Sequence, residues 1–556
     1  MSRPDLGARI IAPGKAEFRV WAPNRERVEL RIVAPQERTI PMRKTGCGYH
    51  EVVADAAPGA RYYYVLDGIQ RPDPASRFQP EGVHGASEVV DPDFEWHDAQ
   101  WNGIALEDYV LYELHVGTFT NEGTFDAIIP RLDALKELGV TAIELLPIGQ
   151  FPGERNWGYD GVYISAAQNS YGGPRALKRM VDAAHQRGMA VVLDVVYNHL
   201  GPEGNYLAEY GPYFTDRYKT AWGQALNFDG PHSDEVRWFF IHNALMWVNE
   251  FHVDALRVDA VHAIVDHSAE PFLQDLTTAV RATGRRVFTI AESDLNDPRV
   301  ITPRESYGLG FDAQWSDDLH HALHALLTGE TAGYYVGYGA ASDLARVLET
   351  GYLYTGQYSE FRGRKYGAKP DTSDGAQFVV YAQNHDQTGN RMMGERLAAL
   401  VSPQQMRLAA AVVVLSPFVP MLFMGEEYGE TAPFQYFTSH SDPDLIDAVR
   451  RGRRQEFEEF QWEGEAPDPH DEETFRRSKL TWQENAEIRQ HYRELFRIRR
   501  DLFRDLDLSK VKATADDQRR TVVMHRANAV VAFNFSDRQQ MIDGIAVEPW
   551  SFALKG

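Results

Sequence analysis

Four apolar segments of this chain end in acidic or histidine residues. The segments "VVLDVVYNH" (191–199), "VDALRVDAVH" (253–262), "VFTIAESD" (287–294) and "FVVYAQNHDQTGNR" (378–391) each begin as a run suited to a buried strand and then turn polar. Carboxylates and imidazoles gathered in one pocket could bind a divalent metal, because Asp and His are common metal ligands. They could also cleave a glycosidic bond, with one carboxylate as the nucleophile and a second as the proton donor.

Arg257 favours the glycosidic chemistry over the metal site. Because side chains alternate along a strand, Arg257 and Asp259 are expected on the same face. A cation there would keep Asp259 ionised and ready to act as a nucleophile, and it would repel a metal ion. Glu292 follows the apolar residues "FTIA", so burial is expected to raise its pKa and suit it to donate a proton. A single polar strand end is most often a cap or loop anchor, but four in one chain point to a shared pocket.

The elements that must position these residues alternate between strand and helix from Tyr109 onward. Eight strand-like runs begin at residues 109, 140, 190, 254, 287, 311, 378 and 419, and amphipathic helices separate most of them. This order predicts an α/β protein built on a (β/α)8 TIM barrel. The carboxyl ends of barrel strands form the floor of the pocket, which explains why these runs end in polar residues.

Prolines and small polar residues suggest where some barrel helices begin. Pro174 is expected in the first turn of a helix that stops at Gly188, and Ser233 is expected to cap the helix that follows it. Pro130 lies inside the helical pattern of residues 124–139 and should kink that helix or begin it.

The chain on either side of the barrel has the alternation typical of strands. Residues 1–95 predict a small N-terminal β-sandwich, 96–108 a linker, 109–503 the catalytic barrel and 504–556 a short C-terminal β-domain. The apolar stretch 408–424 is interrupted by Pro417 and Pro420, so we interpret it as a buried helix followed by a strand and not as a membrane span.

Composition narrows the class of partner. The net charge of −23 over 556 residues disfavours nucleic acid and anionic membranes as partners. Cys47 is the only cysteine, which excludes an intramolecular disulfide and fits a cytoplasmic protein, and the N-terminus lacks the features of a signal peptide. Aromatic residues make up 12% of the chain, which suits either stacking on neutral sugars or an ordinary large core.

The four polar strand ends resemble the sequence regions of a known enzyme family. "DVVYNH", "ALRVDAVH", "IAES" and "QNHD" are similar, in order and separation, to the four regions of the α-amylase superfamily, glycoside hydrolase family 13. The segment "FRVWAPNRERVEL" (18–30) resembles the β-sandwich that precedes the barrel in branching enzymes. The resemblance implies that Asp259 is the nucleophile, Glu292 the proton donor and Asp386 the stabiliser of the transition state.

Further residues are assigned to the cleavage subsite by the same resemblance. Tyr159, in "NWGYDG" (156–161), would stack under the sugar ring at the cleaved bond, and Asp194 would support the region. The substrate-binding residues expected around that bond are Trp157, Tyr159, Asp160, Asp194, His199, Arg257, His262, Asn384 and His385.

The fourth region is similar to that of one branch of the family. "QNHDQTGNR" differs from the "SHDE" type of branching enzymes and resembles the trehalose-releasing branch, as do "FPGERNWGYDGVY" and "MGEEYGETAPFQYF". That branch hydrolyses, with retention, the α-1,4 bond next to the terminal trehalose unit of maltooligosyltrehalose, which releases trehalose and a maltooligosaccharide. Trehalose would be bound by residues after the seventh and eighth strands, namely Gln387, Asn390, Arg391, Glu426, Glu427, Phe434 and Tyr436.

The resemblance also bears on cofactors and partners. No cofactor and no required metal are expected, although Asn198 stands where many α-amylases place a calcium ligand. A monomer is expected, with a synthase that makes maltooligosyltrehalose as its pathway partner. Four alternatives stay open: a 1,4-α-glucan branching enzyme, a general α-amylase-type hydrolase, a carbohydrate-binding barrel without catalysis, and a metal-dependent lyase or hydrolase.

Overall fold

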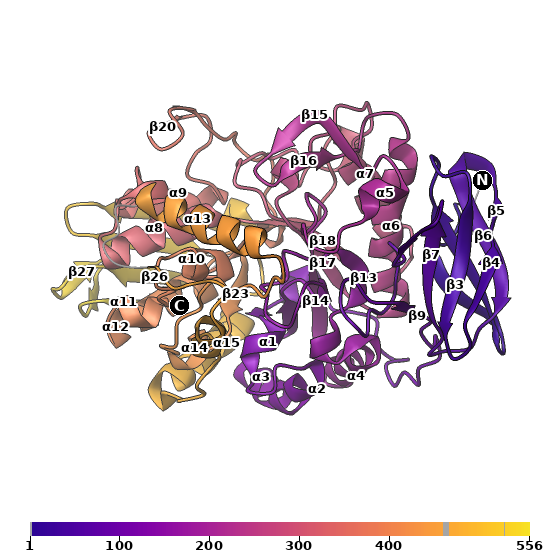
Figure 1. Cartoon of the computed structure of the whole chain (residues 1–556). Helices are drawn as coiled ribbons and strands as arrows, with labels where there is room; N and C mark the ends of the chain where they lie inside the picture. The colour runs from indigo at the N-terminus through magenta and orange to yellow at the C-terminus, as the bar shows by residue number, and fades with distance from the viewer. Residues whose placement is uncertain (1–2, 460–465, 527–528, 556) are drawn as a thin grey trace.

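Eight parallel strands close into a barrel at the centre of the molecule (Figure 1). The computed structural model describes residues 3–459, 466–526 and 529–555. Neighbouring strands are parallel all the way round, and the last pairs with the first. The strands are β10 (Leu111–Leu114), β11 (Ala142–Leu145), β14 (Ala190–Val195), β17 (Ala255–Val258), β18 (Phe288–Ala291), β19 (Ala313–Trp315), β22 (Phe378–Val380) and β23 (Val419–Phe423). Each strand falls in a predicted run, so the (β/α)8 barrel is confirmed.

The interior of the barrel changes from apolar to charged along the strands. Val192, Ala255 and Ile290 belong to a buried cluster that fills the lower part of the barrel. Because side chains alternate, the residue two positions further along each strand also points inward. In β14 and β17 those residues are Asp194 and Arg257, so the charged layer lies directly on the apolar one.

Helices surround the barrel. The larger ones are α3 (Leu132–Leu138), α4 (Gly173–Gln186), α6 (Ser233–Glu250), α7 (Phe272–Arg281), α8 (Asp317–Thr328), α9 (Ala341–Thr350), α12 (Pro403–Leu415) and α15 (Ala486–Leu502). Pro174 lies in the first turn of α4, as predicted. Pro130 lies in a 3-10 turn (Ile129–Arg131) between α2 (Phe125–Ile128) and α3, so it divides the predicted helix in two.

The expected cap of α6 is wrong by one residue. Ser233 is the first helical residue, and His232 occupies the capping position with a left-handed backbone (φ 66°) and no capping hydrogen bond from its side chain. Asp234 and Glu235 stand in the first turn instead, where negative charge favours the exposed N–H groups of the helix.

The N-terminal residues form the predicted β-sandwich. One sheet contains β1 (Gly7–Ala12), β2 (Lys15–Trp21), β6 (Tyr49–Asp55) and β5 (Arg43–Lys44). The other contains β4 (Arg38–Pro41), β3 (Val28–Ala34), β7 (Arg61–Leu66), β8 (Ile69–Arg71) and β9 (Ser87–Glu88). The sandwich lies against the barrel beside β13 and α6 (Figure 1), and Arg71 bridges the two through an ion pair with Glu209.

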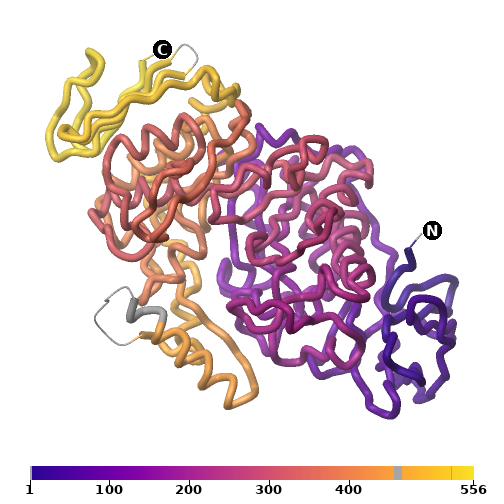
Figure 2. Tube along the Cα trace, turned by 90° about the horizontal axis from the view of Figure 1, so that it is seen from above, coloured from indigo at the N-terminus to yellow at the C-terminus, as the bar shows by residue number. Residues whose placement is uncertain are grey.

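A small β-domain follows the barrel on the side opposite the sandwich (Figure 2). Its main sheet has the strands β24 (Val511–Asp516), β25 (Thr521–Arg526), β26 (Ala529–Asn534) and β29 (Ser551–Lys555), and β27 (Gln540–Ile542) pairs with β28 (Ile545–Val547). Arg526 is buried and donates hydrogen bonds to the carbonyl oxygens of Leu415, Ser416, Phe503 and Asp505. One side chain therefore joins this sheet to the end of α12 and the end of α15.

Further elements, of which α13 is the longest, occupy the loops and connections. They are α1 (Val116–Phe119), α5 (Leu207–Tyr210), α10 (His385–Gly389), α11 (Leu397–Leu400), α13 (Pro443–Glu459), α14 (Glu472–Arg477), β12 (Gly149–Gln150), β13 (Tyr163–Ala167), β15 (Phe214–Thr220), β16 (Gly223–Leu226), β20 (Tyr358–Ser359) and β21 (Arg364–Lys365). Residues 408–424 form the end of α12 and β23, as predicted, and no helix in the described ranges is long and apolar enough to cross a membrane. The domain boundaries at residues 95, 108 and 503 stay predictions.

Candidate active site

Arg257 lies at the centre of the charged layer and is fully buried. Its Nη1 is 2.6 Å from Asp194 Oδ2 and 2.8 Å from Asp259 Oδ1, and its Nη2 is 3.0 Å from Glu292 Oε2. The guanidinium also lies over the indole ring of Trp315, 4.1 Å from the ring centroid. One cation therefore gathers a carboxylate within β14 and two that directly follow β17 and β18, and the expected pairing of Arg257 with Asp259 is present.

Asp259 is held in its ionised form. Burial opposes ionisation, but the charge of Arg257, the nearby His199 and a hydrogen bond from Asn198 together lower the pKa of Asp259 below its usual value. The Asn198 Nδ2 donates to Asp259 Oδ2 at 2.6 Å and to the Asp259 carbonyl oxygen at 3.0 Å. Asn198, which stands where many α-amylases place a calcium ligand, thus directs its amide at the predicted nucleophile.

Glu292 is held in the opposite state. Burial raises its pKa well above the usual range, the charge of Arg257 opposes that rise, and the charges of Asp259 and Asp386 add to it. Its Oε2 accepts a hydrogen bond from the backbone N–H of Ala260 at 2.8 Å, and 18% of the side chain stays exposed. Besides Asp194, Arg257 thus contacts one carboxyl group whose pKa is lowered and one whose pKa is raised, which is the division between nucleophile and proton donor that a glycosidase needs.

His385 is buried on top of Glu113, the inward glutamate of β10. Glu113 Oε1 is 2.6 Å from His385 Nδ1, and Glu113 Oε2 accepts the His385 backbone N–H at 3.0 Å. Burial disfavours the imidazolium, but Asp386 and Glu113 outweigh it and raise the pKa of His385 to about 9. His385 Nε2 then donates to the Tyr159 hydroxyl at 2.7 Å, and that hydroxyl donates to Asp194 at 2.7 Å. Sequence reasoning missed Glu113, although its inward position on the first strand could have indicated it.

Asp386 is the most open of the three predicted catalytic carboxylates, with 36% of its side chain exposed. It stands in the first turn of α10, and its Oδ1 is 3.4 Å from His385 Nε2. Asn384 caps this helix by accepting the backbone N–H groups of Asp386 and Gln387 at 2.9 and 3.1 Å. Asn384 is itself buried, so it fixes the direction of Asp386 and presents no surface of its own.

Trp157 lies beneath the cleft and supports α10. Its ring stacks on Phe434 with centroids 5.1 Å apart and meets His385 edge-on. A Cβ atom on Gly389 would lie 2.1 Å from the indole, so only glycine allows α10 to rest there. Both Trp157 and Phe434 are buried, so these two rings pack beneath the catalytic residues and support α10.

Glu426 and Glu427 have almost no exposed surface, and their role in trehalose binding stays a prediction. Both are fully buried, and burial raises the pKa of each to about 7. Glu426 accepts hydrogen bonds from Gln383 and from the Tyr492 hydroxyl, and Glu427 accepts the hydroxyl of Tyr112. Their carboxyl groups bind the loop after β23 to neighbouring elements.

The remaining predicted trehalose residues differ in exposure. Arg391 is buried and forms two hydrogen bonds to Glu330, at 2.8 and 3.0 Å. Gln387 is half-buried and donates to Asp317 at 3.1 Å, while its Oε1 has no hydrogen-bond partner. Asn390 is exposed and Tyr436 is half-buried, so these two and Gln387 keep surface that a ligand could contact.

Three predicted residues lie around the Asp259 side of the cleft. His199 is buried, and its Nε2 is 3.0 Å from the Tyr159 carbonyl oxygen. His262 is exposed, with its Nε2 3.8 Å from Asp294 Oδ1. Asp160 is half-buried and accepts the Asn156 amide at 2.6 Å.

Trp222 was missed by sequence reasoning. It lies between β15 and β16, is 50% exposed, and stacks flat on His199 with ring centroids 4.4 Å apart. An exposed indole next to a sugar-cleaving site offers a stacking surface for a pyranose ring. No periodic pattern marks a residue at the tip of a hairpin, and only its contact with His199 brings it to the site.

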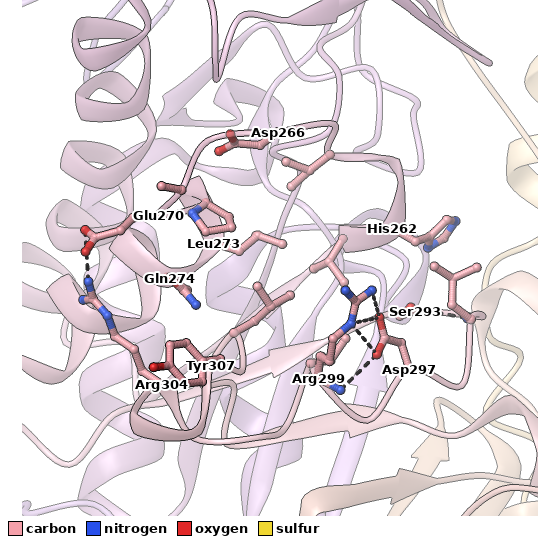
Figure 3. Close-up of a pocket in the computed structure, with 17 residues that line it drawn as sticks. His262, Asp266, Glu270, Leu273, Gln274, Ser293, Asp297, Arg299, Arg304 and Tyr307 are labelled. Atoms are coloured by element: carbon pink, nitrogen blue, oxygen red, sulfur yellow. Dashed lines mark hydrogen bonds and ion pairs between the residues drawn. The ribbon is translucent and has the colours of Figure 1, made fainter. Parts of the chain in front are cut away.

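A separate cavity of about 610 Å³ lies between the segments that follow β17 and β18 (Figure 3). His262 and Ser293 line it, but none of the three predicted catalytic carboxylates does. Charged groups on its wall pair with each other, as Figure 3 shows for Asp297 with Arg299. In the part of the chain that the structure describes, no group of three or more His, Cys, Asp or Glu is arranged to hold a metal ion.

A (β/α)8 barrel whose pocket holds an aspartate of lowered pKa and a glutamate of raised pKa on one arginine has the arrangement of a glycosidase of the α-amylase type. Residues 96–227 match the family model of the α-amylase catalytic domain, and residues 5–82 match that of carbohydrate-binding module 48, the isoamylase N-terminal domain. The crystal structure of an α-amylase candidate from Salmonella typhimurium is similar over 99% of both chains, with a TM-score of 0.92 and 37% identity.

Closely similar proteins share one name. The malto-oligosyltrehalose trehalohydrolase of Saccharolobus solfataricus is 52% identical over 486 residues, which cover 87% of this chain and 85% of that protein. The protein of the same name from Rhizobium sp. (strain M-11) is 46% identical over 98% of this chain and 94% of its own length. The chain therefore belongs to the malto-oligosyltrehalose trehalohydrolase family within the α-amylase superfamily, and the resemblance seen in the sequence is confirmed.

Proposed function

We propose that this protein is a 4-α-D-((1→4)-α-D-glucano)trehalose trehalohydrolase. It hydrolyses the α-1,4 bond next to the terminal trehalose unit of maltooligosyltrehalose and releases trehalose. The observation that carries the proposal is the pair of carboxyl groups on Arg257: an ionised Asp259 and a protonated Glu292, 2.8 and 3.0 Å from the same guanidinium. The identity of 52% to a named trehalohydrolase supports the choice of substrate.

The first chemical step breaks the glycosidic bond. The Asp259 carboxylate attacks the anomeric carbon, while Glu292 donates its proton to the glycosidic oxygen that leaves with trehalose. The products of this step are free trehalose, a maltooligosyl ester on Asp259 and an ionised Glu292. Arg257 Nη2, 3.0 Å from Glu292 Oε2, then stabilises the carboxylate that has just lost its proton.

The second step restores the enzyme. Glu292 takes a proton from water, the resulting hydroxyl group attacks the anomeric carbon, and the ester bond to Asp259 breaks. Two inversions at one carbon give retention overall. Asp386, the most exposed of the three carboxylates, binds sugar hydroxyls during both steps and favours the distorted ring of the transition state.

Recognition of trehalose falls to groups around the pocket that are exposed or half-buried. We assign this role to Trp222 as a stacking surface and to Gln387, Asn390 and Tyr436 as contacts for the leaving disaccharide. Polar groups that hydrogen-bond substrate hydroxyls discriminate strongly, because an analogue that lacks those hydroxyls leaves the groups unpaired.

The pathway partner, the oligomeric state and the cellular compartment are proposed on the same basis. We propose that a synthase that makes maltooligosyltrehalose supplies the substrate, that the protein acts as a monomer, and that it resides in the cytoplasm. The exposed thiol of Cys47 suits a reducing compartment.

The experiment that tests the function compares two matched substrates. One is a maltooligosaccharide, and the other is the same chain ending in trehalose. Free trehalose from the second substrate, with the first almost uncleaved, would establish the reaction. Comparable cleavage of both would indicate a general α-amylase-type hydrolase, and new α-1,6 linkages would indicate a branching enzyme.

A further inference from the structure

We infer that a cleft between the N-terminal β-sandwich and the barrel binds the maltooligosaccharide part of the substrate, several sugar units away from the cleaved bond. This inference rests on the proposed function. The cleft measures about 480 Å³, and its walls come from two parts of the chain. One wall is formed by residues between 78 and 84, where the segment that matches a carbohydrate-binding module ends at residue 82, and the other by loops after β11, β14 and β23.

The cleft opens on the same side of the barrel as the catalytic residues. Glu154, Glu203 and Ser441 lie in loops that follow the carboxyl ends of barrel strands, and these loops gather over the active-site face. The strand β9, which follows the sandwich wall of the cleft, lies close to β13, which belongs to the small two-stranded sheet between barrel strands β11 and β14 (Figure 1). A chain that leaves the catalytic pocket along this face therefore meets the sandwich.

Side-chain contacts connect the cleft to the catalytic centre. His440 is buried between the two, with its Nε2 3.7 Å from Asp160 Oδ2 and its Nδ1 3.3 Å from Glu203 Oε2. Asp160 follows Tyr159, whose hydroxyl contacts His385. The carboxylate of Glu203, which lines the cleft, is thus separated from the sugar-binding loop of the centre by a single imidazole.

His84 provides a fixed, exposed ring at the sandwich wall. Its Nδ1 is 2.7 Å from the Tyr206 hydroxyl and its Nε2 is 3.5 Å from Glu203 Oε1, yet 54% of its side chain is exposed. Contacts at both ring nitrogens hold the imidazole before a ligand arrives, which reduces the entropy lost on binding. The open face of such a ring suits the apolar face of a pyranose.

The polar groups of the cleft fit a neutral, hydroxyl-rich ligand. The exposed carboxylate of Glu154 can accept hydrogen bonds from a ligand, and Asn169, Ser170 and Ser441 can donate and accept them, while Glu203 fixes the position of Ser441. Glu203 is only 7% exposed and is held by the backbone N–H of Ser441 at 2.9 Å and by its hydroxyl. Acidic walls disfavour anionic sugars such as phosphate esters, so the ligand is an uncharged glucan chain.

The test compares two substrates that differ only in the length of the glucan part, maltosyltrehalose and maltohexaosyltrehalose. The wild-type protein is expected to show a higher kcat/KM for the longer one. His84→Ala should lower kcat/KM for maltohexaosyltrehalose by about tenfold, the effect of losing one well-formed contact, and leave maltosyltrehalose within about twofold. His84→Gln keeps a polar group but lacks the ring, and it should behave like His84→Ala.

A matched control is available in the C-terminal sheet. His525 is exposed on β25, and His525→Ala should leave both substrates unchanged. The distal subsite would be overturned if the wild type had equal kcat/KM for the two substrates. It would also be overturned if both His84 variants kept the wild-type ratio of kcat/KM for the long substrate to that for the short one. Loss of trehalose release from both substrates by the wild type would instead contradict the proposed function, so the two failures are distinct.

Discussion

Replacement of Glu113 by glutamine is expected to alter the protonation of His385 from a buried position. Both oxygens of Glu113 accept hydrogen bonds from His385, one from the backbone N–H and one from Nδ1. Glutamine has nearly the same shape, but it carries no charge and offers one oxygen in place of two. The substitution therefore removes a negative charge and sets an amide NH2 group against a buried N–H donor.

The magnitude follows from the pKa of His385. Burial opposes the imidazolium, but Asp386 and Glu113 raise this pKa to about 9, compared with about 6.5 for an ordinary histidine. The difference corresponds to roughly 3 kcal/mol in favour of the cation. Because Glu113 supplies part of it, Glu113→Gln should lower the pKa of His385 by about one to two units. The lost acceptor should reduce the free energy of unfolding by about 2 kcal/mol.

The pH dependence has a definite sign. The pKa of His385 is higher in the folded than in the unfolded protein, so its charge contributes fully to stability below about pH 6.5. That contribution disappears as the pH rises toward about 9. In Glu113→Gln the decline should be smaller and should finish at lower pH.

The assay is NMR titration of the His385 imidazole in both proteins, together with kcat/KM against pH. Glu107 is exposed in the segment just before β10, and Glu107→Gln is the matched control that should leave the pKa of His385 unchanged. A rescue by Glu113→Asp is expected to be partial, since the charge returns on a shorter side chain. An unchanged pKa of His385 in Glu113→Gln would refute the reasoning.

Three further perturbations test other parts of the molecule. Asp259→Asn and Glu292→Gln should each abolish trehalose release without changing the circular dichroism spectrum, and near-normal turnover in either variant would contradict the assigned roles. In the wild type, kcat/KM should fall as the pH rises through the raised pKa of Glu292, because the proton donor is then lost. Trp222→Ala should lower kcat/KM by about tenfold at an unchanged Tm, whereas Trp222→Phe should keep most of the activity, as steady-state assays of both variants would reveal. Arg526→Met should lower the free energy of unfolding by about 3 kcal/mol, because four carbonyl oxygens, three of them buried, lose their donor. Denaturant unfolding measures this loss, and an unchanged midpoint would contradict it.

The barrel was predictable because each strand carries its own signal. A buried strand appears in the sequence as a short apolar run, and the polar residues after it mark the active-site end of the barrel. Side chains alternate along a strand, so the position of Arg257 two residues before Asp259 already implied their contact. The structure places their atoms 2.8 Å apart. Local sequence also indicated that Pro130 would interrupt the helical pattern of residues 124–139. The proline ring clashes with the carbonyl group four residues earlier in a helix, and proline has no N–H to donate.

Contacts between distant segments had no comparable signal. Glu113 and His385 are 272 residues apart, and nothing in either segment specifies the other. Trp222 reaches His199 only because a hairpin folds back over the pocket. Glu426 and Glu427 appeared suited to a ligand because they follow a barrel strand, but the turn that contains them directs both carboxyl groups into the protein.

Protonation states were the least accessible property, because they depend on the balance of charge and burial in the assembled layer. Glu144, Glu292 and Asp259 all surround Arg257 or lie near it, yet their pKa values diverge. Burial dominates at Glu144, whose oxygens have no hydrogen-bond partner, and raises its pKa well above the usual range. At Asp259 the guanidinium of Arg257 and the amide of Asn198 reverse the effect of burial. One arginine can therefore serve an ionised nucleophile and a protonated acid together, because the neighbours of each carboxyl group, and not its residue type, decide which of them keeps its proton.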